Sequence, residues 1–311
     1  MKKEYVGGQA VIEGVMMKSD KKVAVAVRKP DGKIAIKKRN LTSRKSKFFK
    51  APFIRGSFIL IQSLVDGIKS LNYSAEFFEV EDEPSRFEKF LNKIFKEKAN
   101  DLMIYFSIFL SLLFSVILFM LLPTFLGSLF KFLVKNTLVL NLFEGIIRIS
   151  IFIGYVYLIS LNDDIKRVFQ YHGAEHKAIH CYENDLPLEV ENAKSFTTIH
   201  ARCGTNFMFV VMIISMLLFS LFGWPNPYLR VFYRLILLPV VAGISYEVIK
   251  LFSKYDNKVI KILSLPGMYI QKITTKEPDD SQLEVALLAL RAVIEDKESE
   301  YDNKEDFIKV N

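Results

Sequence analysis

The run LMIYFSIFLSLLFSVILFMLL, residues 102 to 122, decides the class of fold to which this chain belongs. It holds 21 residues and no charge. A helix rises about 1.5 Å per residue, so a run of this length crosses the roughly 30 Å hydrocarbon core of a bilayer. The sequence therefore predicts a transmembrane helix here.

Three further apolar runs predict additional spans; they are Leu138 to Leu161, Gly204 to Trp224 and Val231 to Ile249. The first and last of these carry charges, which are Glu144, Arg148, Arg234 and Glu247. Glu144 and Arg148 are four residues apart, so they can pair along one helix face inside a bundle. Hydrophobic residues make up 51% of the chain, which agrees with this pattern. We expect a predominantly α-helical integral membrane protein with about four transmembrane helices.

The distribution of charge predicts the orientation in the membrane. Residues 1 to 50 hold fifteen Lys and Arg against four Asp and Glu, in a chain of net charge +8. A basic segment ahead of the first span is typical of the cytoplasmic side, and this favours membrane insertion over nucleic-acid binding. No apolar signal with a cleavage site begins the sequence. We expect a multi-pass plasma-membrane protein with cytoplasmic termini, surrounded by lipid, and assembling with a membrane-protein partner or with itself.

Outside the spans, the pattern predicts a small β subdomain. Apolar and polar residues alternate in Lys22 to Arg28 and in Lys33 to Lys37, and a Pro-Asp-Gly turn separates them. An isolated hairpin is marginally stable, so we expect it to pack with the glycine-rich start, Tyr5 to Met17, which reads either as a packed loop or as a strand and turn. Residues 53 to 78 predict an amphipathic helix, Pro266 and Gly267 a helix break, and Ser281 with Glu284 a capping box.

These elements divide the chain into six predicted segments. They are a cytoplasmic glycine-rich loop and β-hairpin (1–50), an amphipathic helix and charged linker (51–100), a first pair of transmembrane helices (101–161), a cytoplasmic His/Cys loop (162–203), a second pair of transmembrane helices (204–252), and a cytoplasmic C-terminal helix with an acidic tail (253–311).

The loop from His172 to Cys203, HGAEHKAIHCYENDLPLEVENAKSFTTIHARC, contains all four histidines and both cysteines of the chain. Imidazole and thiolate are the usual ligands of zinc and neighbouring metals, and a cytoplasmic location keeps thiols reduced. Asn162, followed by two aspartates, predicts the start of a helix that carries the histidines. The segment HGAEH matches the H-x-x-E-H pattern, in which the two histidines bind zinc and the glutamate, here Glu175, activates water.

The sequence leaves the remaining ligands open. His172 and His176 are the first two, and the further candidates are His180, Glu183, His200 and Cys203. His200 and Cys203 have a spacing suited to a single ion. The cofactor expected on this basis is zinc or another divalent transition metal. The competing interpretation is a polar helix end whose histidines cap carbonyl groups or pair with Glu175 and Glu183.

Five segments of the chain resemble those of the YqhQ family of bacterial integral membrane proteins; they are GGQAVIEGVMMK, DDIKRVFQYHGAEHK, HARCGTNF, LPVVAGISYEVIK and PGMYIQKITTKEP. Members of that family are described as predicted metal-dependent enzymes. The resemblance covers nearly the whole chain and implies a membrane protein with a metal site, but it supplies no reaction. Ala201 stands where the family pattern leads us to expect proline. Gln9, Glu13 and Gly243 to Glu247 are also typical of the family, which implies that these segments converge with the histidine helix near the membrane surface.

The leading functional hypothesis is a membrane-embedded, metal-dependent hydrolase with a site that faces the cytoplasm. His172 and His176 would hold the metal, His200 or Cys203 would complete the set, and Glu175 would be the general base. A membrane-proximal peptide or lipid would be the substrate. The alternative is a non-catalytic assembly or scaffold protein, in which a structural metal site or polar cluster holds the loop in place. An ion transporter that uses the charges within the spans is a third option.

Overall fold

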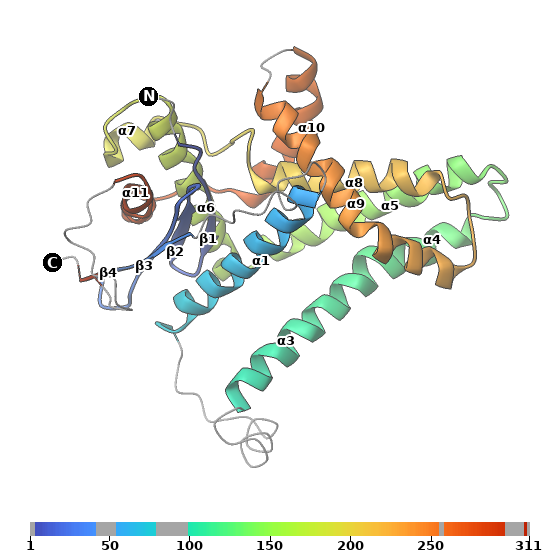
Figure 1. The fold of residues 1–311 in the computed structure, drawn as a ribbon, viewed down its shortest axis with the longest axis horizontal. Helices are drawn as coiled ribbons and strands as arrows, with labels where there is room; N and C mark the ends of the chain where they lie inside the picture. Colours follow the sequence, from blue (N-terminus) through green and yellow to red (C-terminus); the bar gives the residue numbers. More distant parts are fainter. Residues whose placement is uncertain (1–3, 42–53, 79–98, 255–257, 296–307, 310–311) are drawn as a thin grey trace. The chain divides into compact units, whose positions relative to one another are not determined.

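The computed structural model describes residues 4–41, 54–78, 99–254, 258–295 and 308–309, and it is mostly helical (Figure 1). The described residues fall into two compact units. The first draws on residues 1–78, 155–214 and 238–311, and the second on residues 79–154 and 215–237. The predicted acidic tail and most of the predicted charged linker lie outside the described residues.

The first unit contains an antiparallel sheet in which each strand pairs with the next along the chain. Its strands are β1 (Gly7–Val11), β2 (Gly14–Lys18), β3 (Lys22–Arg28) and β4 (Ile34–Asn40), and the two-residue β5 (Ile308–Lys309) pairs with β4. The predicted hairpin is confirmed as β3 and β4. The glycine-rich start forms a strand, a turn and a strand, the second of the two structures that its sequence allowed.

Helices cover both faces of this sheet (Figure 1). Ala24 and Ala26 of β3 pack with α6 (Asp163–Glu183) and α11 (Asp280–Ile294). The alternate positions, such as Val25, pack on the opposite face with Tyr73 of α1 (Ile54–Ala75). Successive side chains of a strand point to opposite faces, so the apolar run of β3 supplies a core to both. The predicted amphipathic helix is therefore a cover for the sheet.

A buried carboxylate also joins α1 to the sheet. Asp66 accepts hydrogen bonds from Lys18 of β2 at 2.8 Å and from Arg39 of β4 at 2.6 Å. Burial opposes ionisation of this carboxyl, but the hydrogen bonds and charges of Lys18 and Arg39 outweigh it and lower the pKa of Asp66 below its ordinary value. The pair of basic residues thus fixes the position of α1 against two strands.

The predicted start of α6 is confirmed. The side chain of Asn162 accepts the N–H of Asp164 at 2.9 Å and of Ile165 at 3.2 Å, and the two aspartates lie in the first turn. The predicted capping box of the last helix is wrong by two residues. Asp279 caps α11, because its carboxylate accepts the N–H of Gln282 at 2.9 Å while Gln282 accepts the N–H of Asp279 at 3.0 Å.

The predicted helix break at Pro266 and Gly267 is also wrong, because α10 (Lys258–Thr274) continues through both residues. Tertiary packing accounts for this. A Cβ atom on Gly267 would lie only 2.2 Å from the side-chain oxygen of Asn206, so the helix passes close to the start of α8 (Gly204–Ser220) at the one residue without a side chain. Packing has overridden the local preference.

Three helical stretches are long and apolar enough to cross a membrane; they are Phe106–Leu129, Thr137–Ile159 and Tyr228–Phe252. The first comprises most of α3 (Ala99–Val116), a π-helical segment (Ile117–Leu121) and α4 (Leu122–Leu129), and the others lie in α5 (Thr137–Ile159) and α9 (Pro227–Lys254). The fourth predicted run, Gly204 to Trp224, forms α8, which ends at Ser220 and is shorter at 17 residues. The structure thus gives three candidate spans where the sequence predicted about four.

Candidate metal centre

Two segments of the first unit bring all six predicted ligand residues together. The helix α6 carries four of them, and the turn that leads into α8 carries the other two. They form two groups, His172 with His176 and Cys203, and His180 with Glu183 and His200. Within each group, the ligand atoms lie within 4.8 Å of one another. The histidines at spacings of four share one face of α6, which is why a single helix serves both groups.

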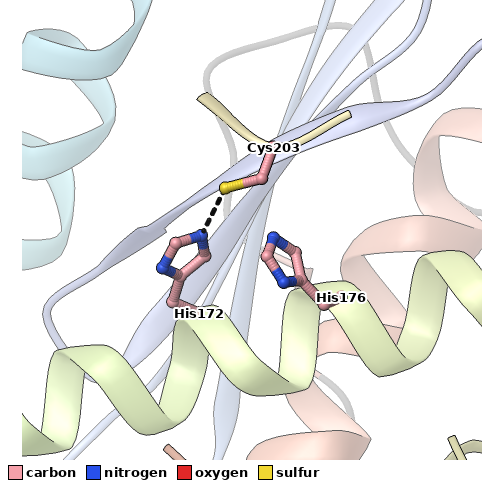
Figure 2. Close-up of side chains that lie close together, drawn as sticks. All are labelled: His172, His176 and Cys203. Carbon is pink, nitrogen blue, oxygen red and sulfur yellow. Dashed lines mark hydrogen bonds between the residues drawn. The ribbon is translucent and has the colours of Figure 1, made fainter. Parts of the chain in front are cut away.

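His172 is oriented by the backbone of α10. Its Nδ1 lies 2.8 Å from the carbonyl oxygen of Thr274, and since a carbonyl only accepts, the proton is on Nδ1. The Nε2 lone pair is left to face Cys203, whose Sγ lies 3.2 Å away (Figure 2). A metal-binding histidine commonly donates its other ring N–H to a carbonyl in this way.

His176 repeats the arrangement one turn later. Its Nδ1 donates to the carbonyl oxygen of Thr198 at 2.5 Å. Its Nε2 is buried and has no hydrogen-bond partner in the described part of the chain. Figure 2 shows both imidazole rings rising from the same face of α6 toward the sulfur of Cys203. Burial also lowers the pKa of His176, which favours the neutral ring that can bind a metal.

Cys203 directly precedes α8. The N–H of Thr205 lies 3.4 Å from its sulfur, so the first turn of the helix faces the thiol. Burial opposes ionisation of Cys203, but the contacts with His176 and with Thr205 outweigh it and lower the pKa of the thiol. A helix N-terminus and a neighbouring imidazole are the usual means of stabilising a thiolate, which is the form that binds metals.

Glu175 is buried between α6 and strand β1. Burial raises the pKa of this carboxyl to about 8, although the neighbouring His172 acts in the opposite direction. One carboxyl oxygen, Oε2, has no hydrogen-bond partner among the described residues. The strand approaches closely because residue 8 is glycine; a Cβ atom there would lie 2.9 Å from Cδ of Glu175. The glutamate is thus held beside His172 and Cys203 with one unpartnered carboxyl oxygen and a raised pKa.

The second group of ligands is satisfied by the protein itself. His200 accepts the N–H of Arg202 at Nδ1 (3.2 Å) and donates from Nε2 to Glu183 (3.2 Å). Glu183 also forms an ion pair with Arg202, and the imidazole of His180 donates to the carbonyl of Ile199 at 3.0 Å. Burial opposes ionisation of Glu183, but His200 and Arg202 outweigh it and lower its pKa. The ring nitrogens of His200 are both engaged, so this group is a hydrogen-bonded network.

The turn between the groups is fixed by a residue that the sequence did not single out. The amide of Gln271 in α10 accepts the N–H of His200 at 2.8 Å and donates to its carbonyl at 2.9 Å. Asn206 donates to the carbonyl of Ala201 at 2.5 Å. Backbone carbonyls and a glutamine 71 residues away along the chain carry no local motif. No pattern in the sequence could have identified them as part of the site.

The family-typical residues outside the loop serve to hold α6 and α1. Glu13, in the β1–β2 turn, pairs with Arg167 and accepts the hydroxyl of Tyr171 at 3.2 Å, so it anchors the sheet to α6. Glu247 pairs with Arg55 of α1 through both carboxyl oxygens. Both acids tie elements of the fold together in this geometry, Glu13 the sheet to α6 and Glu247 the helix α9 to α1.

The first group suits zinc better than the second. Two imidazoles, of which His172 contacts Cys203 through Nε2 and His176 has an unpartnered Nε2, would make a Cys/His₂ set with the thiolate, and three protein ligands would leave one position of a tetrahedral ion open. The unpartnered Nε2 of His176 is the feature that a metal would satisfy. The second group would first have to break the hydrogen bonds of His200 and the ion pair of Glu183.

Comparison with known proteins identifies the family. Residues 51–296 match the model of the family described as "Protein of unknown function (DUF1385)". The chain is 39% identical over 288 residues to "Uncharacterized protein YqhQ" of Bacillus subtilis (strain 168), and the match covers 90% of this chain and 89% of that protein. No solved structure matches the chain. The resemblance seen in the five segments is confirmed, and the chain belongs to the YqhQ (DUF1385) family.

Proposed function

We propose that this protein is a membrane-embedded, metal-dependent hydrolase, with His172, His176 and Cys203 as the metal ligands. The observation that carries the proposal is the pair of buried, unpartnered atoms on consecutive residues of α6, Oε2 of Glu175 and Nε2 of His176. Leaving a buried polar atom without a partner costs about 1–3 kcal/mol, so two together indicate a function other than stability.

The side chains divide the chemistry between them. A zinc-like ion supplies a Lewis acid that makes water nucleophilic at neutral pH. Glu175 would accept a proton from the attacking water and return it to the leaving group, and its burial makes the protonated form accessible enough for the return step. His172 and His176 are kept in the ligating tautomer by the carbonyls of Thr274 and Thr198.

The packing of the first unit supports four membrane crossings. The sheet, α6 and α11 share one hydrophobic core, and a subdomain packed around such a core lies on one side of a membrane. The chain must then cross an even number of times between α6 and α11. That interval contains one candidate span, Tyr228–Phe252, and the apolar α8. We propose that α8 crosses as well, since its 17 residues extend roughly 25 Å, near the lower limit for a spanning helix.

The basic N-terminal segment favours the cytoplasm for this core, in the plasma membrane, with both termini on the same side. The thiol of Cys203 is then in a reducing compartment, where it remains available as a ligand. If α8 crosses the bilayer, Cys203, which directly precedes this helix, lies close to the membrane surface. The substrate class that fits this location is a membrane-proximal peptide or lipid.

A second candidate function is a non-catalytic scaffold with a structural metal site. The burial of His176 and Cys203, 1% and 8% exposed, favours it, because structural sites are closed to solvent. In that case Glu175 would fill space beside the metal, and its ability to exchange a proton would be irrelevant.

The two functions are separated by comparing Glu175→Gln with His176→Ala in cells that depend on the protein. Glutamine keeps the size of the side chain and can still accept the backbone hydrogen bond from Gly8, but it cannot take up a proton. The hydrolase proposal predicts that both variants fail, while purified Glu175→Gln retains its metal and its thermal stability. Full function of Glu175→Gln together with failure of His176→Ala would establish the scaffold.

A further inference from the structure

The second unit contains a cluster of charges separate from the metal centre. Arg148 lies 2.9 Å from Oε1 of Glu144, Arg230 lies 3.4 Å from Oε2, and Arg234 also pairs with Oε1. Glu144, Arg230 and Arg234 are all buried, at 1%, 5% and 6% exposed. The predicted pair of Glu144 and Arg148 is therefore confirmed, as part of a larger cluster that two candidate spans build.

The charges of this cluster do not balance. Three arginines and one glutamate give a formal charge of +2 in apolar surroundings, where an uncompensated charge is costly. Among the residues of this unit whose side chains the structure describes, Glu144 supplies the one carboxylate. The described acidic side chains therefore leave two positive charges to be matched.

Arg230 also has an unused donor. Arg148 donates from Nε to the carbonyl of Phe119 at 3.1 Å, and Arg234 donates to Thr124 as well as to Glu144. The Nε of Arg230 is buried without a hydrogen-bond partner in the described structure. The guanidinium of Arg230 stacks instead on Trp224, 4.0 Å from the ring centroid. Stacking fixes the plane of the guanidinium and leaves Nε without a partner.

Arg230 and Arg234 line a cavity at one end of the apolar helices. The remaining lining residues are Asn141, Phe219, Phe222, Gly223, Pro225 and Tyr233. The hollow is partly open to the outside, and the space free of protein atoms, solvent at its mouth included, is about 250 Å³. It lies beside the turn that joins α8 to α9, next to the start of the candidate span Tyr228–Phe252, where lipid headgroups would lie if this helix crosses the bilayer. Two arginines, one of which carries an unpartnered donor, and several apolar side chains thus line one space.

We propose that this cavity binds a phosphate-type anion, with Arg230 and Arg234 as its principal contacts. Guanidinium groups present donors in a fork that matches phosphate oxygens, and one phosphodiester or phosphate would offset one or two of the unmatched charges. The phosphate of an anionic phospholipid and a free phosphate ion share this chemistry. The phenylalanines of the lining favour the lipid, whose acyl chains would continue along the helices.

The test measures thermal unfolding of the full-length protein in a neutral detergent. Three ligands are titrated at matched ionic strength, namely phosphatidylglycerol, phosphatidylcholine and inorganic phosphate. Phosphatidylglycerol is expected to raise the unfolding midpoint, and Arg230→Gln is expected to weaken that ligand about tenfold, the effect of losing one charged hydrogen bond. Lys135→Gln is the matched control, because it removes the same charge from an exposed position just before α5.

Each outcome decides a point. A shift with inorganic phosphate alone, lost in Arg230→Gln, supports the site and makes the free ion its ligand. A shift with phosphatidylglycerol and none with phosphate assigns the lipid. Should Arg230→Gln fail to fold, Arg230→Lys keeps the charge but not the fork and is expected to weaken binding severalfold. The proposal is overturned if neither anion stabilises the wild type, or if the Arg230 variants respond as Lys135→Gln does.

Discussion

Replacing Gly8 by alanine tests how the sheet holds Glu175 beside the candidate metal ligands His172, His176 and Cys203. The new methyl group would lie 2.7 Å from the carbonyl oxygen of Met16 and 2.9 Å from Cδ of Glu175. Both distances are shorter than real Cβ atoms show, and neither neighbour can easily move. The Met16 oxygen belongs to the paired strand β2, and Glu175 is surrounded by the core. The variant must therefore push β1 away from α6 or displace the glutamate.

Overpacking of this kind costs about 1–3 kcal/mol, and each kcal/mol lowers the unfolding midpoint of a domain of this size by about 2–4 °C. Gly7→Ala is the matched control, because no atom lies within 4 Å of a Cβ at that position of the same strand. It should change stability by less than about 0.5 kcal/mol. Thermal unfolding of the purified protein measures both. Equal midpoints for Gly7→Ala and Gly8→Ala would refute the placement of Glu175 against β1.

Two further predictions concern residues that position the site and the sheet. Gln271→Ala leaves the backbone N–H of His200 buried without a partner and removes one of the two hydrogen bonds to its carbonyl, which keeps the N–H of Cys203, so the variant should cost about 1–3 kcal/mol and lower the metal content. Gln282→Ala, in the cap of α11, should destabilise without loss of metal, and equal metal in both variants would contradict the role of Gln271. Asp66→Asn should destabilise by about 1–3 kcal/mol at neutral pH. Because the pKa of Asp66 is lowered in the folded protein, its contribution to stability is present above about pH 4 and is lost as the pH falls through the folded-state pKa. Stability measured down to acid pH should therefore become equal in the wild type and Asp66→Asn. A difference that stays constant with pH would refute this role of Asp66.

The sequence predicted those parts of the fold that have a local signal. The alternation in Lys22 to Arg28 predicted β3, and Asn162 predicted the start of α6. The helix break predicted at Pro266 was wrong, because contact between Gly267 and Asn206 keeps α10 helical. Such long-range packing is set by the whole fold, and a local pattern does not contain it.

The candidate site was predictable to the same extent. The spacing of histidines on one helix face predicted which side chains gather. It left open whether His200 or Cys203 joins His172 and His176, because that depends on the turn that Gln271 holds from α10. The structure places Cys203 with the first two histidines and His200 with the second group. The contact of Arg230 with Glu144 was also not predictable from local sequence, since the two residues are 86 positions apart and lie on different helices.

The metal content of the purified full-length protein tests the central claim most directly. Elemental analysis by mass spectrometry should find about one zinc-like ion per chain in the wild type, as three protein ligands to a single ion require. The double variant His172→Ala/His176→Ala should lose it. His180→Ala, which removes the same side chain one turn further along α6, should retain it, because that residue lies in the hydrogen-bonded group. Equal metal content in the double variant and the wild type would contradict the assignment of His172, His176 and Cys203 as the metal centre.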